Sequence, residues 1–126
     1  GCIVSNKAII EGGYARVNAS EYTTLNLRYG TKYEIYNTVD RYMYFPTVDE
    51  IRNWVGSLPA SIIIDVIAHH SNSANFRMKW STGKTIYDWN GGSNSEWTMS
   101  KGDSCTFLLV YESASSYYAQ IMQRNS

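Results

Sequence analysis

The chain has 126 residues, a length typical of one domain with a single hydrophobic core. Basic and acidic residues number 11 each, and the basic ones are scattered, which argues against a nucleic-acid-binding protein. Because no apolar run approaches the roughly 20 residues that cross a bilayer, we also expect no membrane insertion. Eleven tyrosines and four tryptophans are the unusual feature, and rings with a polar tip are typical of recognition surfaces.

Hydrophobic alternation with a period of two dominates the chain and predicts many short strands. In chain order we expect strands at residues 23–29, 33–38, 61–70, 76–80, 105–111 and 117–122. Gly30 and Thr31 separate the first two in a way that is typical of a β-hairpin. Turn-forming clusters between most of the runs favour an all-β fold, an antiparallel β-sandwich of the jelly-roll kind.

Residues 47–56 carry the signals of a short helix instead. Thr47 can cap the N-terminus, Glu50 is its capping-box partner, and Gly56 can end the helix. The apolar residues at positions 48, 51, 54 and 55 fall on one helical face. We therefore expect one helix that closes an end or an edge of the sandwich.

The first candidate for ligand binding is a loop bracketed by Trp89 and Trp97. Aromatic rings stack on the C–H faces of sugars, and Asn90, Asn94 and Glu96 can bond to their hydroxyl groups. In the alternative interpretation, the two rings only anchor a long hairpin loop in the core.

Tyr42 and Tyr44 are the second candidate, because they share one face if residues 42–45 form a strand. An exposed face of this kind is a recognition surface. If the helix or a neighbouring subunit covers it, the same rings are packing or a subunit interface.

Catalytic motifs are not found in the sequence, and we expect a protein that is not an enzyme. No Gly-x-Ser-x-Gly nucleophile elbow is present. Asp88 and Glu96 are a conceivable carboxylate pair across a loop, so a polysaccharide hydrolase is kept as an alternative.

The histidines and cysteines give no sign of a cofactor or metal site. His69 and His70 are adjacent, and on a strand they point to opposite faces, so one chain cannot chelate a metal with both. In a three-fold assembly one histidine per chain could meet its copies at the axis and bind a metal, but we favour a strand-end pair with one ring buried and one solvated. Cys105 is interpreted as a buried free thiol, although a disulfide with Cys2 stays open.

The last third of the chain has a recognisable order of predicted hairpins, turns and strands. From residue 82 on it contains TGKTIYDWNGG, then EWTMSKGDSCTFLLVY, then YYAQIMQR. A polar hairpin, a Lys-Gly-Asp-Ser turn, a long apolar strand and an aromatic terminal strand follow one another. This order resembles the closing hairpins of bacteriophage tail-fibre tip domains and of related trimeric adhesive fibres of bacteria.

The resemblance implies a homotrimeric β-sandwich knob on a virion tail fibre or a bacterial cell-surface fibre. Such a tip, residues 1–126 with its N-terminus leading from a shaft, attaches to a cell-surface glycan or protein. Many of these fibres bind metal through His-x-His repeats, and His69 and His70 lack the intervening residue, so that site is not carried over. A structural trimerisation or capping module is the alternative, in which the aromatic residues are all interface.

Overall fold

The computed structural model describes residues 15–18, 23–27 and 30–125, which form two sheets and one helix, α1 (Val48–Val55). The larger sheet has seven strands, in the spatial order β1 (Ala15–Asn18), β3 (Lys32–Tyr36), β5 (Ala60–Ala68), β10 (Ser104–Tyr111), β11 (Tyr117–Asn125), β7 (Ile86–Tyr87) and β8 (Ser93–Asn94). The smaller sheet has four strands, in the order β2 (Thr23–Thr24), β4 (Arg41–Tyr44), β6 (Phe76–Lys79) and β9 (Trp97–Met99).

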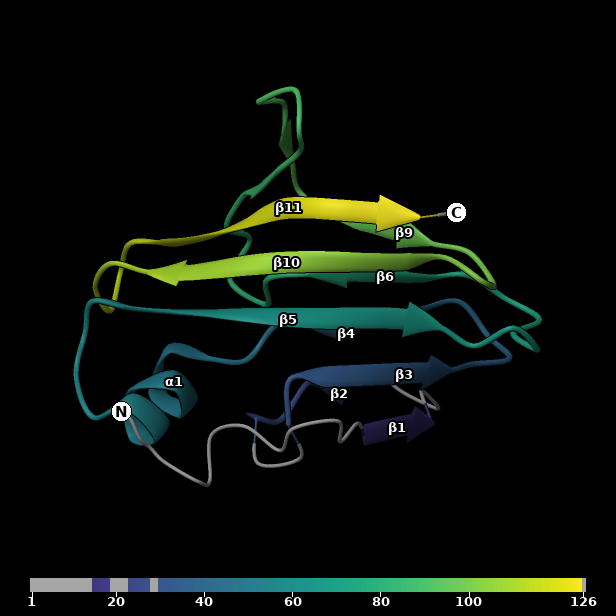
Figure 1. The fold of residues 1–126 in the computed structure, drawn as a ribbon, viewed down its shortest axis with the longest axis horizontal. Helices are drawn as coiled ribbons and strands as arrows, with labels where there is room; N and C mark the ends of the chain where they lie inside the picture. The colour runs from purple at the N-terminus through teal and green to yellow at the C-terminus, as the bar shows by residue number, and fades with distance from the viewer. Residues whose placement is uncertain (1–14, 19–22, 28–29, 126) are drawn as a thin grey trace.

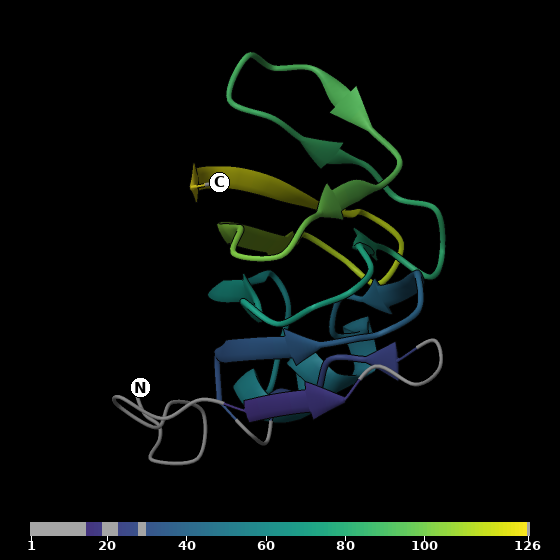
Figure 2. The same cartoon turned by 90° about the vertical axis from the view of Figure 1, so that its right-hand side faces the viewer.

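The smaller sheet lies behind the larger one in Figure 1, and the hydrophobic core fills the space between them. The hairpin of β7 and β8 projects beyond β11, as both Figure 1 and the turned view of Figure 2 show. Within the described residues, no helix is long and apolar enough to cross a bilayer.

Successive strands alternate between the two sheets over the first half of the chain. Because each strand is followed by one in the opposite sheet, the next strand of the same sheet runs in the original direction. As a result β3 pairs in parallel with β1 and β5, and β4 pairs in parallel with β2 and β6. The later pairs β5–β10, β10–β11 and β6–β9 are antiparallel.

This topology corrects two expectations. The fold is mostly β with one helix, as the sequence predicts, but the antiparallel jelly-roll arrangement is not confirmed, because both sheets are mixed. The hairpin predicted around Gly30 and Thr31 is wrong, because β2 and β3 belong to different sheets. A period of two shows that one face of a strand is buried, and it does not show which strand lies beside it.

The core is built from the inward side chains of both sheets and contains several large rings. Phe45 packs against Trp80 and Phe107, with ring centroids 4.8 and 5.1 Å apart. On β10 the buried residues alternate, and Cys105 among them is a free thiol that is only 3% exposed. Burial raises the pKa of this thiol to about 12. Cys2, its conceivable partner, lies outside the described residues.

Helix α1 begins and ends where the sequence predicts. The Thr47 hydroxyl accepts a hydrogen bond from the Glu50 amide at 3.2 Å, and Gly56 ends the helix with a φ of +100°. Ile51 is fully buried, as predicted. Val55 is predicted on the same apolar face, but it is 53% exposed. The Glu50 carboxylate accepts a hydrogen bond from the Leu27 amide, which ties the helix to the segment that follows β2. Partial burial raises the pKa of Glu50.

Candidate functional site

Tyr42 and Tyr44 lie side by side on the outer face of the smaller sheet. Between them Met43 points into the core and is 0% exposed, so the pleat of β4 turns both tyrosines away from the core. Their rings stack with centroids 6.4 Å apart and planes 13° from parallel. The predicted shared face is therefore present, and both rings are half-buried.

The neighbouring strand β6 places two cations beside these rings. In the parallel register Arg77 lies opposite Tyr42 and Lys79 lies opposite Tyr44. The Lys79 Nζ is 4.9 Å from the centroid of the Tyr42 ring, and the Arg77 Cζ is 5.9 Å from it. Both distances fall within the range of cation–π attraction, so the two cations help to hold the ring in place.

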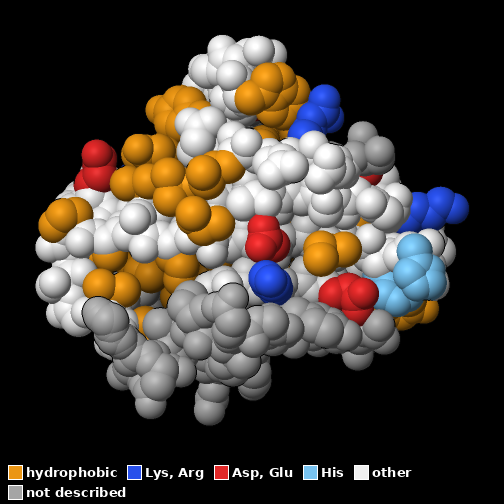
Figure 3. All heavy atoms as spheres, in the orientation of Figure 1, with side chains coloured by type: hydrophobic (Ala, Val, Ile, Leu, Met, Phe, Trp, Pro, Cys, Tyr) orange, Lys and Arg blue, Asp and Glu red, His pale blue; other side chains and the backbone are white. Residues whose placement is uncertain are grey.

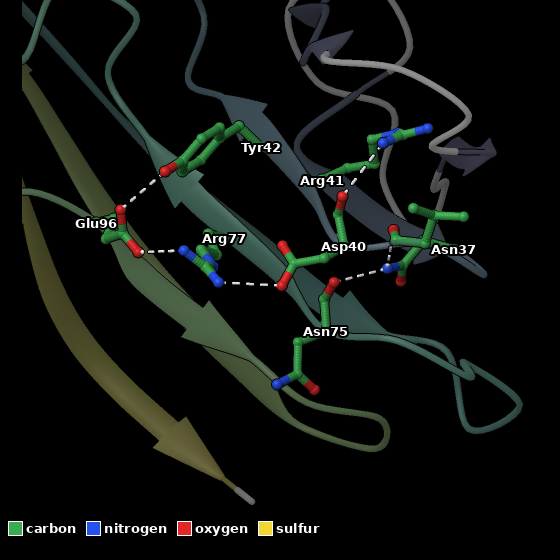
Figure 4. Close-up of polar contacts among 8 residues, drawn as sticks. Asn37, Asp40, Arg41, Tyr42, Asn75, Arg77 and Glu96 are labelled. Atoms are coloured by element: carbon green, nitrogen blue, oxygen red, sulfur yellow. Dashed lines mark hydrogen bonds and ion pairs between the residues drawn. The ribbon is translucent and has the colours of Figure 1, made fainter.

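Glu96, which precedes β9, completes the cluster (Figure 4). Tyr42 donates its hydroxyl hydrogen to Glu96 Oε1 at 3.2 Å, and Arg77 donates to Glu96 Oε2 at 3.1 Å. The same guanidinium donates to Asp40 Oδ2 at 3.1 Å. The carboxylates of Asp40 and then Glu96 raise the pKa of Arg77.

We call the set Tyr42, Tyr44, Arg77, Lys79 and Glu96 the tyrosine face. Its residues come from three different segments of the chain, and the hydrogen bond between Tyr42 and Glu96 spans 54 positions. Together with the neighbouring Asp40, the face has two cations, Arg77 and Lys79, and two carboxylates, so its charge is balanced.

The structure divides the predicted loop site in two. Glu96 and Trp97 are neighbours in the chain, and the pleat of the incoming strand sends them to opposite sides. Glu96 joins Tyr42 on the outer face, whereas Trp97 lies opposite the buried Met78 and packs against the core. The tryptophans therefore form a separate cluster, in which Trp97 serves as the anchor that the alternative interpretation expected.

Asp88 and Asn94 brace the hairpin from within. The Asp88 carboxylate accepts hydrogen bonds from the amides of Gly92 and Asn90, each at 2.9 Å, and from the Asn94 side chain at 3.3 Å. These bonds, with Gly92 first and Asn94 second, lower the pKa of Asp88. A Cβ atom at Gly92 would lie 2.6 Å from the Asp88 Oδ2, so any larger residue there would push the Asp88 carboxylate out of its hydrogen bonds. Both polar side chains thus stabilise the loop, while Asn90 at its tip is exposed.

Trp89 is the exposed ring of the tryptophan cluster. It is 49% exposed, meets Trp97 edge to face at a centroid distance of 5.7 Å, and lies 4.2 Å from the Arg124 Cζ. A shallow hollow of about 290 Å³ adjoins it, lined also by Met122 and Gln123 of β11. Because the Arg124 guanidinium covers the Trp89 ring closely, stacking of a ligand here competes with a cation–π contact.

An end pocket that the sequence did not indicate opens between α1, the ends of β4 and β6, and the turn before β11. Its volume is about 310 Å³. Phe45, Trp80 and Tyr117 supply aromatic rings, and Thr82 and Arg52 are among the polar residues that line it. The pocket combines residues from three separate stretches of the chain, 45–52, 80–82 and 114–117, and no local pattern brings such positions together.

The sequence predicts that His69 and His70 point to opposite faces of a strand. This prediction is wrong, because both residues follow the end of β5 and their rings lie together. Their rings stack with centroids 4.2 Å apart, and Tyr36 meets the His69 ring edge to face at 5.4 Å. The amide of Ser71 donates to His69 Nδ1 at 3.0 Å, which engages that nitrogen in a turn. In the described part of the chain, no group of three or more His, Cys, Asp or Glu side chains is placed to hold a metal ion.

The tyrosine face therefore has the chemistry of a binding surface, with stacked rings, hydrogen-bonding oxygens and balanced charge on the outer face of one sheet. It joins one residue of the first predicted site, Glu96, to both residues of the second. Comparison of the chain with protein-family models, with curated protein sequences and with solved structures gave no match.

Proposed function

We propose that this chain is the receptor-binding tip of a trimeric fibre, on a phage virion or a bacterial cell surface, and that its tyrosine face binds a cell-surface glycan. The observation that carries the proposal is the convergence of Tyr42, Tyr44 and Glu96 with two cations on one sheet face. The role is attachment, without catalysis.

Charge balance favours a neutral glycan as the ligand. Arg77 is already bonded to Glu96 and Asp40, so a charged ligand would have to displace an ion pair. Hydroxyl groups, in contrast, can add to the network, because carboxylate and phenol oxygens accept further hydrogen bonds. The edges and exposed parts of the tyrosine rings provide apolar contact for the C–H groups of a sugar.

Replacement of Tyr42 by alanine tests the proposal. We expect Tyr42→Ala to weaken binding to a glycan by about tenfold or more, because it removes half of the ring stack and a hydrogen-bond partner of Glu96. The measurement is binding of the labelled protein to an array of purified bacterial surface polysaccharides and eukaryotic glycans, followed by titration calorimetry with each hit.

Tyr36→Ala is the matched control, because Tyr36 is a half-buried tyrosine on β3 of the other sheet. It should bind as the wild-type chain does. Equal binding by Tyr42→Ala and the wild type, with the circular dichroism spectrum of both unchanged, would show that the tyrosine face is not the site.

A second observation favours assembly into an oligomer. Both the fibre-tip function and the alternative, a purely structural module, imply such an assembly. On the outer face of the larger sheet an apolar patch runs across β5, β10 and β11 (Figure 3). We define it by Ile63, Leu108, Val110 and Tyr118; Ile63 is 49% exposed and the other three are half-buried. We propose that further copies of this chain cover the patch in a homotrimer, which would raise glycan avidity by about 10²–10⁴-fold without new contacts to the ligand.

Light scattering on a sizing column tests the assembly. We expect three times the mass of one chain for the wild type, and the mass of one chain for Ile63→Lys, since covering the patch with another copy would take the ammonium group out of water. Thr98→Lys adds the same charge at an exposed position of the other sheet and should leave the trimer intact. A wild-type chain that elutes as a monomer at micromolar concentration would refute the trimer.

A further inference from the structure

We propose that the end pocket is a second binding site, which takes one neutral sugar unit or a polyol of similar size. Its volume of about 310 Å³ is at the low end of the range for small-molecule sites, so it suits a single unit and not a chain of them. None of the tyrosine-face residues lines the pocket, so the inference does not rest on the function proposed for that face.

The apolar part of the pocket is a rigid aromatic wall. Trp80 is 2% exposed and packs against Phe45, Tyr111 and Tyr117, with centroid distances of 4.8, 5.5 and 5.0 Å. Because each ring is held by its neighbours, the wall does not have to be ordered when a ligand binds. A preformed wall of this kind reduces the entropy cost of binding.

Hydroxyl groups stand at the rim of this wall. Thr82 Oγ1 and the Tyr117 hydroxyl form a hydrogen bond of 2.8 Å with each other, at an exposed position. Such a pair uses one of its two hydrogens, so the other hydrogen and the remaining lone pairs can bond to a hydroxylated ligand. The pair therefore both donates and accepts, as a sugar hydroxyl also does.

The indole of Trp80 supplies an independent reason to expect a polar ligand. Its Nε1 is buried and has no hydrogen-bond partner among the described residues. Buried N–H groups nearly always have an acceptor, and leaving one unpaired costs about 1–3 kcal/mol. Trp80 lines the pocket, and an oxygen of a bound ligand can accept from this N–H once the side chains that cover the nitrogen move aside.

The charges around the pocket point to a neutral ligand. Asp49 and Arg52, which both line it, form an ion pair at 3.9 Å. The N-terminus of α1 would attract an anion, but Asp49 and Glu50 already occupy its first turn. Neither an anion nor a cation is therefore favoured.

The experiment follows the four tryptophan indole N–H resonances of the ¹⁵N-labelled full chain by NMR. Glucose, galactose, mannose, rhamnose, N-acetylglucosamine and glycerol are the probes, each titrated separately. We expect at least one of them to shift the Trp80 resonance saturably while the Trp54 resonance stays in place. Substitution of each tryptophan by phenylalanine assigns the four signals.

Two conservative variants remove only the hydroxyl groups. Thr82→Val and Tyr117→Phe should each weaken the binding of the active probe by about three- to tenfold, which is the usual loss for one hydrogen bond. Tyr36→Phe is the matched control, because Tyr36 is a half-buried tyrosine on β3 that does not line the pocket. It should bind the probe as the wild type does.

The result also separates this site from the tyrosine face. In Tyr42→Ala the Trp80 response should persist unchanged, even where binding to the glycan array is lost. The inference is overturned if no probe shifts the Trp80 resonance, if both hydroxyl variants bind as the wild type does, or if Tyr42→Ala abolishes the response.

Discussion

Phe107→Ala is expected to lower the free energy of unfolding by about 3–5 kcal/mol, which is a large part of the stability of a domain of this size. Phe107 is 0% exposed and lies in the middle of β10, between Ile64 of β5 and Ile121 of β11. Its ring also meets Phe45 of the opposite sheet at a centroid distance of 5.1 Å. Truncation therefore opens a cavity between both sheets. Urea unfolding followed by circular dichroism and tryptophan fluorescence measures the loss.

Met122→Ala is the matched control for this substitution. Met122 directly follows Ile121 on β11, and it is 53% exposed. Loss of its side chain should cost about 1 kcal/mol or less, since little apolar area is removed from the core. If Phe107→Ala cost no more than Met122→Ala, the packing of the two sheets around β10 would be wrong.

The elements of the fold that depend on nearby residues could be predicted from the sequence. Thr47 and Gly56 mark the helix because capping involves residues within one turn. The strands around Phe76 and Phe107 could be predicted because alternation is also local. The order of strands in the sheets could not be predicted, because it depends on which distant strand pairs with each strand along its edge.

In the candidate site too, the features that depend on nearby residues could be predicted, and those that depend on distant strands could not. Tyr42 and Tyr44 share a face by the geometry of a single strand, and this was predictable. The hydrogen bond of Tyr42 to Glu96 and its contact with Lys79 depend on the positions of β6 and β9, which the alternation between sheets decides. Grouping Glu96 with the tryptophans was wrong for a local reason, because adjacent strand residues point to opposite sides.

Asn72→Ala is expected to cost about 2–3 kcal/mol of stability, as much as the loss of a sizeable apolar side chain, because it leaves a buried donor unpaired. Asn72 is 5% exposed, and its Oδ1 accepts the backbone N–H of Asn37 at 3.0 Å. Its Nδ2 donates to the carbonyl of Ile35 at 3.0 Å. One side chain thus ties the end of β3 to the turn after β5.

Asn37 extends this link to the smaller sheet. It is 2% exposed, and its Nδ2 donates to the carbonyl of Asn75, just before β6, at 2.8 Å (Figure 4). The two asparagines thus join the two sheets at one end, where the apolar core cannot satisfy backbone polar groups.

Urea unfolding again provides the measurement, with Asn53→Ala as the matched control. Asn53 is exposed on α1, where alanine is the better helix former, so this variant should be as stable as the wild type or slightly more so. A cost below about 0.5 kcal/mol for Asn72→Ala would place it among ordinary surface substitutions and refute the link. A larger cost, with the tyrosine face still binding, would show that the two asparagines hold the sheets together without taking part in recognition.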